Sequence, residues 1–197
     1  EVVLDSLILG DSSEEGQMRV LLAAAKKEPV ESLVKTIGSL GMTVGAMDIN
    51  AFAMLNAFLA VNPSPEKKGI ALIDLGHSHT DLVISIGSSP YFMRQIQIGG
   101  QDINTALIRN FSVPPQKAEE YKLGVGKVDK KALLQAQVQV LDDIIKEIQL
   151  SFGYFENSCN TTISGIYVSG GMIEAEGVLK YLSEKMGIKL ERWNPTK

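Results

Sequence analysis

Two short stretches that lie far apart in the chain carry residue types suited to binding phosphate. The first, DLGHSHT at residues 74–80, follows an apolar strand predicted at 70–73 and precedes another strand predicted at 81–87. A strand, a glycine turn and a second strand present backbone N–H groups and a hydroxyl at a hairpin tip, with the carboxylate of Asp74 beside them. Such a tip can hold phosphates and a Mg²⁺-bound water. Rossmann and P-loop sites differ, because there a helix follows the glycine turn directly.

The second stretch, YVSGGM at residues 167–172, ends one predicted strand and opens a predicted helix. Two glycines after a strand let another group approach the backbone closely, although a tight turn alone would also explain them. Each stretch by itself is a weak signal. Together, in one α/β region, they predict a single cleft at which Asp74 meets Gly170 and Gly171.

Several polar residues near these stretches also have ordinary structural explanations. Asp74 could cap a turn. Glu119 and Lys122 lie three residues apart on a predicted helix, where they could form a solvated ion pair worth about 0.2–0.5 kcal/mol. His77 and His79 are the only histidines in the chain, and a metal site would need further ligands. We therefore expect no metal ion bound directly by histidine.

The first sixty residues have the pattern of a small α+β module. We predict strands at 1–9, 19–25 and 42–49, a turn at 10–13, a helix from Glu28-Pro29 to Gly41, and a helix at 50–60. Proline in a first helical turn and glycine just past a helix end are typical boundary signals. The order strand–strand–helix–strand predicts a compact unit of its own, and residues 62–65 (NPSP) predict a linker after it.

The second half has the pattern of a mixed sheet with a helical insertion. We predict strands at 70–73, 81–87, 91–98, 163–169 and 188–193, and helices at 102–110, 116–123, 129–157 and 174–186. The long helix carries an apolar seam with spacings of three and four: Leu134, Val138, Leu141, Ile145, Ile148, Phe152 and Phe155. Such a seam favours a helix lying on a sheet or on another helix of the same domain, with an intermolecular coiled coil as the alternative.

Composition excludes several classes of function. The 197 residues carry a net charge of −4 without a Lys/Arg-rich run, which argues against a nucleic-acid partner. The single cysteine, Cys159, excludes an internal disulfide and fits a reducing compartment. The longest apolar-biased run, at 51–61, is too short to span a bilayer, which needs about 20 residues. We expect neither a membrane span nor a signal peptide, and the strand-like start at Glu1 suggests a piece of a longer protein.

The order and spacing of these motifs resemble the actin-like ATPase superfamily, in which DxGxxxT is the second phosphate motif and the strand with its glycine pair is the adenosine motif. Within it the chain is similar to the PilM family of type IV pilus assembly proteins, relatives of FtsA. Stretches that carry the resemblance are residues 20–28 (VLLAAAKKE), 40–42, 47–53 (MDINAFA), Glu147-Ile148 with the aromatic residues up to Phe155, and Asn194-Pro195. Leu150 departs from the pattern, since PilM-like long helices usually carry a basic residue there.

The resemblance implies a fold class and a division into domains. The fold would be α/β: an α+β subdomain and a ribonuclease H/actin-like mixed-sheet domain, together a fragment of a two-lobed actin-like ATPase. Residues 1–60 would form the FtsA-like extra subdomain with its connecting helix. Residues 66–197 would form the second lobe, with a helical insertion at about 100–160. The first phosphate motif of the superfamily would precede Glu1, so we expect little hydrolysis and weak ATP binding from this chain alone.

The resemblance also implies roles for individual residues. Asp74 would orient Mg²⁺ or a water near the γ-phosphate, and Gly76 would let the backbone approach the phosphates. The turn residues would offer N–H groups, and Thr80 a hydroxyl. Glu119 and Lys122 would face ribose and adenine. The residues implied to bind nucleotide are Asp74, Gly76, His77, Ser78, His79, Thr80, Glu119, Lys122, Gly170, Gly171 and Met172.

The function implied first is that of a nucleotide-binding scaffold, and whether the protein is an enzyme stays open. It would bind ATP or ADP with Mg²⁺ in the cytoplasm and attach to a pilus or type II secretion platform of the bacterial inner membrane. Attachment would occur through the N-terminal tail of a PilN-like bitopic membrane protein, with residues 1–60 helping to form the groove, and self-association would be compatible with it. The alternatives are a small-molecule kinase or ATPase of the same fold and an FtsA-like filament former, since fold alone does not separate them.

Overall fold

The structure, a computed structural model, describes residues 1–11, 17–62 and 68–194. The chain divides into two compact units, Glu1–Ile49 and Asn50–Lys197, which are described separately below. Three sequence-based expectations fall on undescribed residues: the tip of the turn at 10–13, the linker prolines at 63 and 65, and Pro195. The expectations for all other elements can be compared with the structure.

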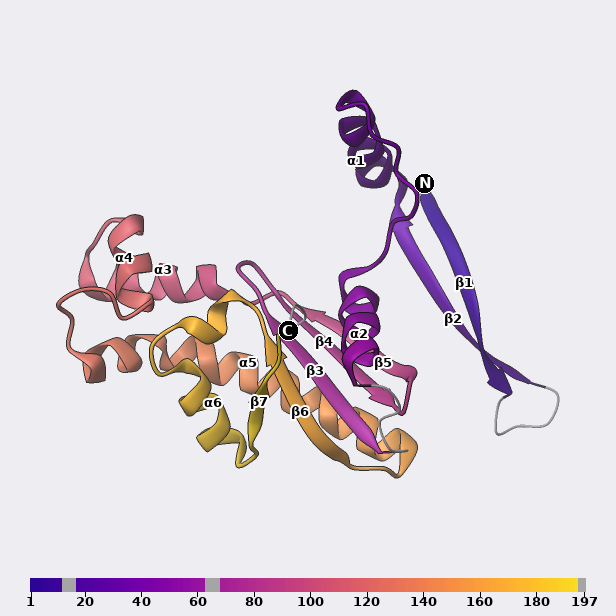
Figure 1. The fold of residues 1–197 in the computed structure, drawn as a ribbon. Coiled ribbons are helices and arrows are strands. Elements are labelled where there is room, and N and C mark those ends of the chain that lie inside the picture. The colour runs from indigo at the N-terminus through magenta and orange to yellow at the C-terminus, as the bar shows by residue number, and fades with distance from the viewer. Residues whose placement is uncertain (12–16, 63–67, 195–197) are drawn as a thin grey trace. The chain divides into compact units, whose positions relative to one another are not determined.

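The first unit consists of a hairpin and a helix (Figure 1). Strands β1 (Val2–Asp11) and β2 (Met18–Lys26) pair antiparallel, with a register shift between Ile8 and Gly10, and α1 (Lys27–Ser39) follows β2 directly. Gly41, with a φ of +75°, lies just past the end of α1, as the sequence predicted. The bounds of these elements differ from the predicted ones by one or two residues.

The third strand predicted for this unit, at 42–49, is absent. Within the described residues β1 and β2 pair only with each other, and 42–49 have no regular secondary structure. A strand is stable only when its backbone groups pair with a neighbour, and Gly45 adds no side chain that could pack on one. The predicted order strand–strand–helix–strand was therefore wrong in its last element.

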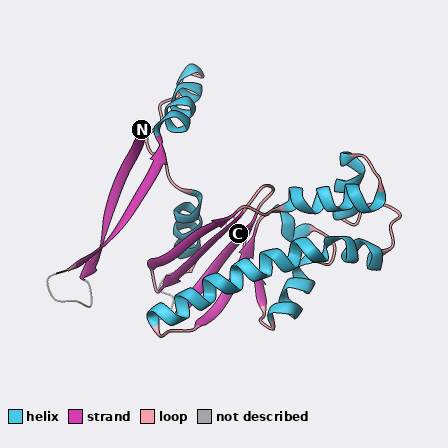
Figure 2. Ribbon diagram, turned by 180° about the vertical axis from the view of Figure 1, so that it is seen from behind, coloured by secondary structure: helices cyan, strands magenta, loops and turns pink. Residues whose placement is uncertain are grey.

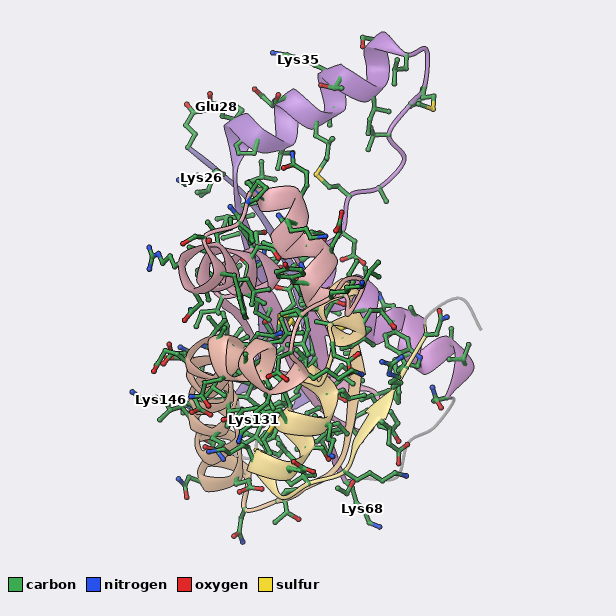
Figure 3. All side chains as sticks on the ribbon, turned by 90° about the vertical axis from the view of Figure 1, so that its left-hand side faces the viewer. Lys26, Glu28, Lys35, Lys68, Lys131 and Lys146 are labelled. Atoms are coloured by element: carbon green, nitrogen blue, oxygen red, sulfur yellow. The ribbon has the colours of Figure 1, made fainter. Side chains whose placement is uncertain are left out.

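The first unit leaves its apolar side chains exposed. None of the residues of α1 is buried, and Leu33 is 49% exposed. Large apolar side chains of the hairpin are also exposed: Val2, Val3, Leu4, Leu7, Ile8, Met18, Val20 and Leu22. Figure 3 shows the charged ends of Lys26, Glu28 and Lys35 projecting from this unit. A two-stranded hairpin with one helix lacks the layers needed to enclose a core.

The second unit is built on a five-stranded mixed sheet in the order β5-β4-β3-β6-β7. The strands are β3 (Gly69–Leu75), β4 (Thr80–Ile86), β5 (Ser89–Ile96), β6 (Ile163–Ser169) and β7 (Leu190–Arg192). The first three form an antiparallel meander, whereas β6 pairs parallel to both β3 and β7. The predicted hairpin at 70–87 is thereby confirmed.

Helices cover both faces of this sheet (Figures 1 and 2). On one face α2 (Asn50–Val61) buries Ala51, Leu55 and Phe58, at spacings of four and three, against β3 and β4. The other face carries the main core under α5 (Lys130–Cys159) and α6 (Val178–Met186). Both central strands, β3 and β4, are therefore almost entirely buried.

The long helix α5 confirms the predicted apolar seam. Its N-cap is Asp129, whose Oδ1 accepts a hydrogen bond from the N–H of Ala132 at 2.8 Å. Of the seven seam residues, the last five, from Leu141 to Phe155, are buried, whereas the first two are half-buried. The seam packs in the core of its own unit, which agrees with the intramolecular interpretation.

The remaining helices lie at the end of the sheet that carries the β3–β4 turn (Figures 1 and 2). They are α3 (Gly100–Phe111) and α4 (Pro115–Lys122). After β6 the chain forms a short 3₁₀ helix, η1 (Gly171–Glu174), before α6 begins at Val178. The helix predicted at 174–186 therefore starts four residues late, because Gly177 adopts a φ of +79° in front of it. In the described part of the chain, no helix combines the length and apolar character that a bilayer crossing requires.

Candidate functional site

The parallel pairing of β3 with β6 brings the two predicted stretches together. Asp74 and Ser169 are Cα partners across the two strands, and the Ser169 hydroxyl donates to Asp74 Oδ1 at 2.8 Å. Gly170 follows immediately, and a Cβ atom at its position would lie 2.4 Å from the carbonyl oxygen of Leu75. The carboxylate of Asp74 and the glycine pair thus lie at the same end of the sheet, where the neighbouring parallel strands β3 and β6 have their carboxyl ends.

The β3–β4 turn is held in place by the start of α3. The N–H of Gly76 donates to the carbonyl of His79 at 3.0 Å, which closes the turn. The N–H groups of Gly100 and Gln101 donate to the carbonyls of Gly76 and His77 at 3.0 and 2.7 Å. The turn backbone is therefore fixed from both sides, as a site with preorganised N–H groups requires.

The hydroxyl at the exposed tip of this turn belongs to Ser78 rather than Thr80. Thr80 is fully buried, and its hydroxyl donates to the carbonyl of Ile98 at 2.9 Å. This corrects the expectation that Thr80 offers a hydroxyl to phosphate, because that proton is already used inside the unit. His77 and Ser78 are exposed at the tip, and His79 is half-buried.

Helix α4 presents a polar cluster to the same region. Glu119 Oε2 accepts hydrogen bonds from Lys122 Nζ at 2.7 Å and from Asn104 Nδ2 of α3 at 2.6 Å. The Lys122 side chain is 6% exposed and the Glu119 side chain 44% exposed. The pair is therefore not the solvated surface pair of the simpler interpretation, since its cation is buried and only its carboxylate reaches solvent.

The charge of Glu119 is stabilised by these contacts. Burial raises the pKa of the Glu119 carboxyl, but hydrogen bonds from Lys122 and Asn104 and the positive charges of Lys122 and His77 outweigh it. The pKa therefore lies below its ordinary value. A Cβ atom at Gly100 would lie 3.3 Å from Lys122 Nζ and 3.9 Å from the Cα of His77, so α4 lies near the tip of the β3–β4 turn.

The two glycines of the second stretch serve different purposes. Gly170 has a φ of +96° and lies against Leu75, so the protein itself requires glycine there. At Gly171, in contrast, a Cβ atom would meet no atom within 4 Å, so the absent side chain leaves open space. The Met172 side chain is 2% exposed and belongs to the core, so the predicted contact of this residue with a nucleoside could involve only its backbone.

A cavity of about 290 Å³ lies on the α2 face of the sheet, beside Asp74. Its lining residues are Asn50, Ala53, Met54, Ala57, Asp74, Asp81, Ser169 and Trp193. Asp81 is 6% exposed and is the Cα partner of Asp74 across β3 and β4, so two carboxylates face the same cavity. Sequence reasoning missed Asp81 and Asn50, although the strict alternation of a strand places Asp81 on the face of its cross-strand partner.

The residues described include no group of three His, Cys, Asp or Glu side chains that could hold a metal ion. The site's donor set is instead a turn with backbone N–H groups, two carboxylates and hydroxyls. Such a set suits an anion accompanied by a hydrated cation better than a directly ligated metal.

A family profile described as "Type IV pilus assembly protein PilM" matches residues 1–197. Among curated relatives, the cell division protein FtsA of Borreliella burgdorferi is 22% identical over 127 residues, which cover 64% of this chain and 30% of that protein. FtsA of Helicobacter pylori strain 26695 is 26% identical over 119 residues, which cover 60% of this chain and 24% of that protein. The chain thus spans less than a third of the length of these relatives.

Solved structures share the fold more completely. A PilM-PilN type IV pilus biogenesis complex matches with a TM-score of 0.85 at 27% identity, covering 98% of this chain and 56% of that one. MreB5 of Spiroplasma citri bound to ADP matches with a TM-score of 0.58 at 18% identity, covering 87% and 62%. The archaeal actin homolog Ta0583 in complex with ADP gives 0.62 at 16% identity, covering 92% and 56%. These matches and the mixed sheet confirm an actin-like α/β fold.

Proposed function

Because this chain belongs to the PilM family of type IV pilus assembly proteins, we propose that it binds ATP or ADP at the carboxyl ends of β3 and β6 and acts as a scaffold for a membrane partner. The observation that carries the nucleotide half of this proposal is the pairing of Asp74 with Ser169. This pairing brings the hydrogen-bonded β3–β4 turn close to Gly171, and the space beside Gly171 is open. The structures of MreB5 and Ta0583 contain ADP, which supports the same ligand class.

The proposed roles follow from the exposure of each side chain. The backbone N–H groups of His77, Ser78 and His79 and the Ser78 hydroxyl would hold phosphate oxygens, since the N–H of Gly76 closes the turn. Asp74 would hold Mg²⁺ through a water, with the nucleotide supplying the remaining oxygens. Glu119 would accept hydrogen bonds from ribose hydroxyls, because its carboxylate is the exposed member of its ion pair. The base would lie against the backbone at Gly171.

Titration calorimetry with ATP and ADP, in the presence of Mg²⁺ and with the full-length protein, tests this site. Gly171→Leu fills the open space and should weaken nucleotide binding at least about tenfold, which corresponds to about 1.4 kcal/mol. The matched control is Gly153→Leu on α5, where a Cβ atom also meets nothing within 4 Å. Equal affinities of the two variants and the wild type would contradict the proposed position of the base.

The partner would be the N-terminal tail of a PilN-like bitopic membrane protein, bound in the cytoplasm. The PilM-PilN complex among the structural matches supports this partner. The first unit supports it independently, because its hairpin exposes large apolar side chains that a partner segment could cover. Nucleotide would act by shifting the population of the state that binds the tail.

Binding of a PilN-like tail peptide, measured with and without ATP, tests the scaffold function. Leu22→Ser on β2 should weaken peptide binding, whereas Leu150→Ser on α5 should not, although both side chains are more than half exposed. Equal peptide affinity with and without ATP would remove the switching role. Unchanged peptide affinity of Leu22→Ser would remove the first unit as the binding region.

A further inference from the structure

A chain of polar contacts runs from the tip of the β3–β4 turn to strand β5. Ser78 Oγ lies 2.9 Å from Nδ1 of His79, and Nε2 of the same ring lies 3.5 Å from Oδ2 of Asp81. The other carboxylate oxygen of Asp81 accepts a hydrogen bond from Gln95 Nε2 at 3.1 Å. An exposed hydroxyl is thereby connected, through one imidazole ring, to a carboxylate that is 6% exposed.

The strand geometry explains why these groups meet. His79 and Asp81 are two residues apart, so their side chains project from the same face of the hairpin. Asp74 lies on this face as the cross-strand partner of Asp81. The other packed elements direct their charges elsewhere: α2 carries none, Arg94 of β5 contacts Glu147, Asp102 of α3 caps Gly99, and Glu119 contacts Lys122. Among the described residues, Asp81 is therefore the charged side chain that contacts the His79 ring.

The protonation state of His79 decides what the Ser78 hydroxyl can offer to a ligand. In the neutral ring with a proton on Nε2, which faces Asp81, Nδ1 is an acceptor and the Ser78 O–H must donate to it. Ser78 then presents only its oxygen lone pairs to solvent, and these repel a phosphate oxygen. In the imidazolium form Nδ1–H donates to Ser78 Oγ, and the hydroxyl proton is free to point outward.

We propose that His79, oriented by Asp81, is a positioning residue that turns the Ser78 hydroxyl into a donor for phosphate, so that nucleotide binding at the turn is coupled to proton uptake by His79. This inference rests on the proposed nucleotide site. No covalent step is involved: the proton comes from solvent, stays on the ring while phosphate is bound, and leaves when the nucleotide dissociates. By reciprocity, nucleotide affinity should rise as pH falls across the range in which histidine titrates.

The ring in the free protein can be tested without any nucleotide. Long-range ¹H–¹⁵N spectra at pH 8 should show the His79 tautomer with its proton on Nε2. A proton on Nδ1 at that pH would overturn the proposal, because Ser78 would then already be free to donate. Asp81→Asn should change the tautomer populations of His79 and leave those of His77 unaltered.

The coupling is tested by calorimetry of Mg-ADP with the full-length protein, in buffers of different ionisation enthalpy. The number of protons taken up per bound nucleotide should be larger for the wild type than for His79→Asn. Any protons that the nucleotide itself takes up or releases are the same in both proteins, so they drop out of this difference. Wild-type affinity should fall about three- to tenfold from pH 6 to pH 8, and that of His79→Asn should change little. His77 takes no part in the contact chain between Ser78, His79 and Asp81, so His77→Asn should keep the wild-type pH dependence, whatever its affinity.

Ser78→Ala separates hydroxyl orientation from the charge of the ring. If the hydroxyl transmits the effect, Ser78→Ala loses the pH dependence although His79 and Asp81 are intact. A pH dependence that survives in Ser78→Ala would overturn the proposal and assign phosphate binding to the imidazolium itself. Nucleotide binding without any difference between wild type and His79→Asn would overturn the coupling alone. Absence of nucleotide binding at every pH would overturn the proposed function and the coupling with it.

Discussion

The two glycine turns of the site are built in different ways. The β3–β4 turn is fixed by hydrogen bonds from α3 and carries polar side chains at its tip. The turn after β6 presents little polar chemistry: Gly170 is locked against Leu75, and Gly171 borders open space. The first turn can therefore contact charged groups of a ligand, whereas the second leaves space for part of a ligand beside the backbone. A glycine at such a turn can therefore serve two separate purposes: Gly170 is required by the protein's own packing, whereas Gly171 leaves space for the proposed ligand.

The largest effect is expected for Gly170→Ala. A Cβ atom there would lie 2.4 Å from the carbonyl oxygen of Leu75, at a φ of +96° that favours glycine. The free energy of unfolding should drop by about 3–5 kcal/mol, because β6 must move away from β3. Urea denaturation measures this drop. Gly171→Ala should stay within about 0.5 kcal/mol of the wild type, and an equal loss in both variants would erase the contrast between the glycines.

A smaller effect is expected at the first turn for Gly99→Ala. Its Cβ atom would lie 2.6 Å from the carbonyl oxygen of His77, so the turn and the start of α3 must separate slightly. We expect a loss of about 2 kcal/mol in unfolding free energy. Gly100→Ala is the control, since its nearest neighbour is the flexible end of Lys122 at 3.3 Å, and it should cost less. Thermal denaturation of both variants measures these losses. A larger loss for Gly100→Ala than for Gly99→Ala would contradict the role of α3 in holding the turn.

Two serines of β6 allow stability and binding to be separated. Ser169 donates to Asp74 and Ser164 donates to the carbonyl of Gly69, at opposite ends of the same pair of strands. Each Ser→Ala change should cost about 0.5–1.5 kcal/mol of unfolding free energy. Ser169→Ala should in addition weaken nucleotide binding, as measured by calorimetry, because Asp74 loses its orientation. Equal binding by both variants would argue that Asp74 takes no part.

The smallest effect concerns acid stability near the first turn. The pKa of Glu119 is lowered in the folded state from its ordinary value of 4.5, so its contribution to stability is complete above that value. The contribution is lost as pH falls from 4.5 through the lower folded-state pKa. Urea midpoints between pH 3 and pH 6 should therefore vary less with pH in Glu119→Gln than in the wild type. An identical pH profile of the two proteins would refute the role of this carboxylate.

The sequence predicted the elements of the second unit well because their signals are local. Apolar runs on both sides of a glycine turn defined the hairpin, and the three-and-four spacing from Leu134 to Phe155 defined α5. The strand predicted at 42–49 failed because a strand depends on a partner that no local pattern reveals. The same limitation applies to side chains: the buried hydroxyl of Thr80, the core position of Met172 and the pairing of Asp81 with Asp74 depend on register between strands.

The bond between Ser169 and Asp74 joins residues 95 positions apart. β4, β5, α3, α4 and α5 all lie in the loop that this parallel ladder closes. Closing so long a loop is a slow, non-local step. We therefore expect the proposed ligand site to form late in folding. We expect nucleotide to slow global unfolding rather than to accelerate refolding, because its contacts appear only after the rate-limiting closure.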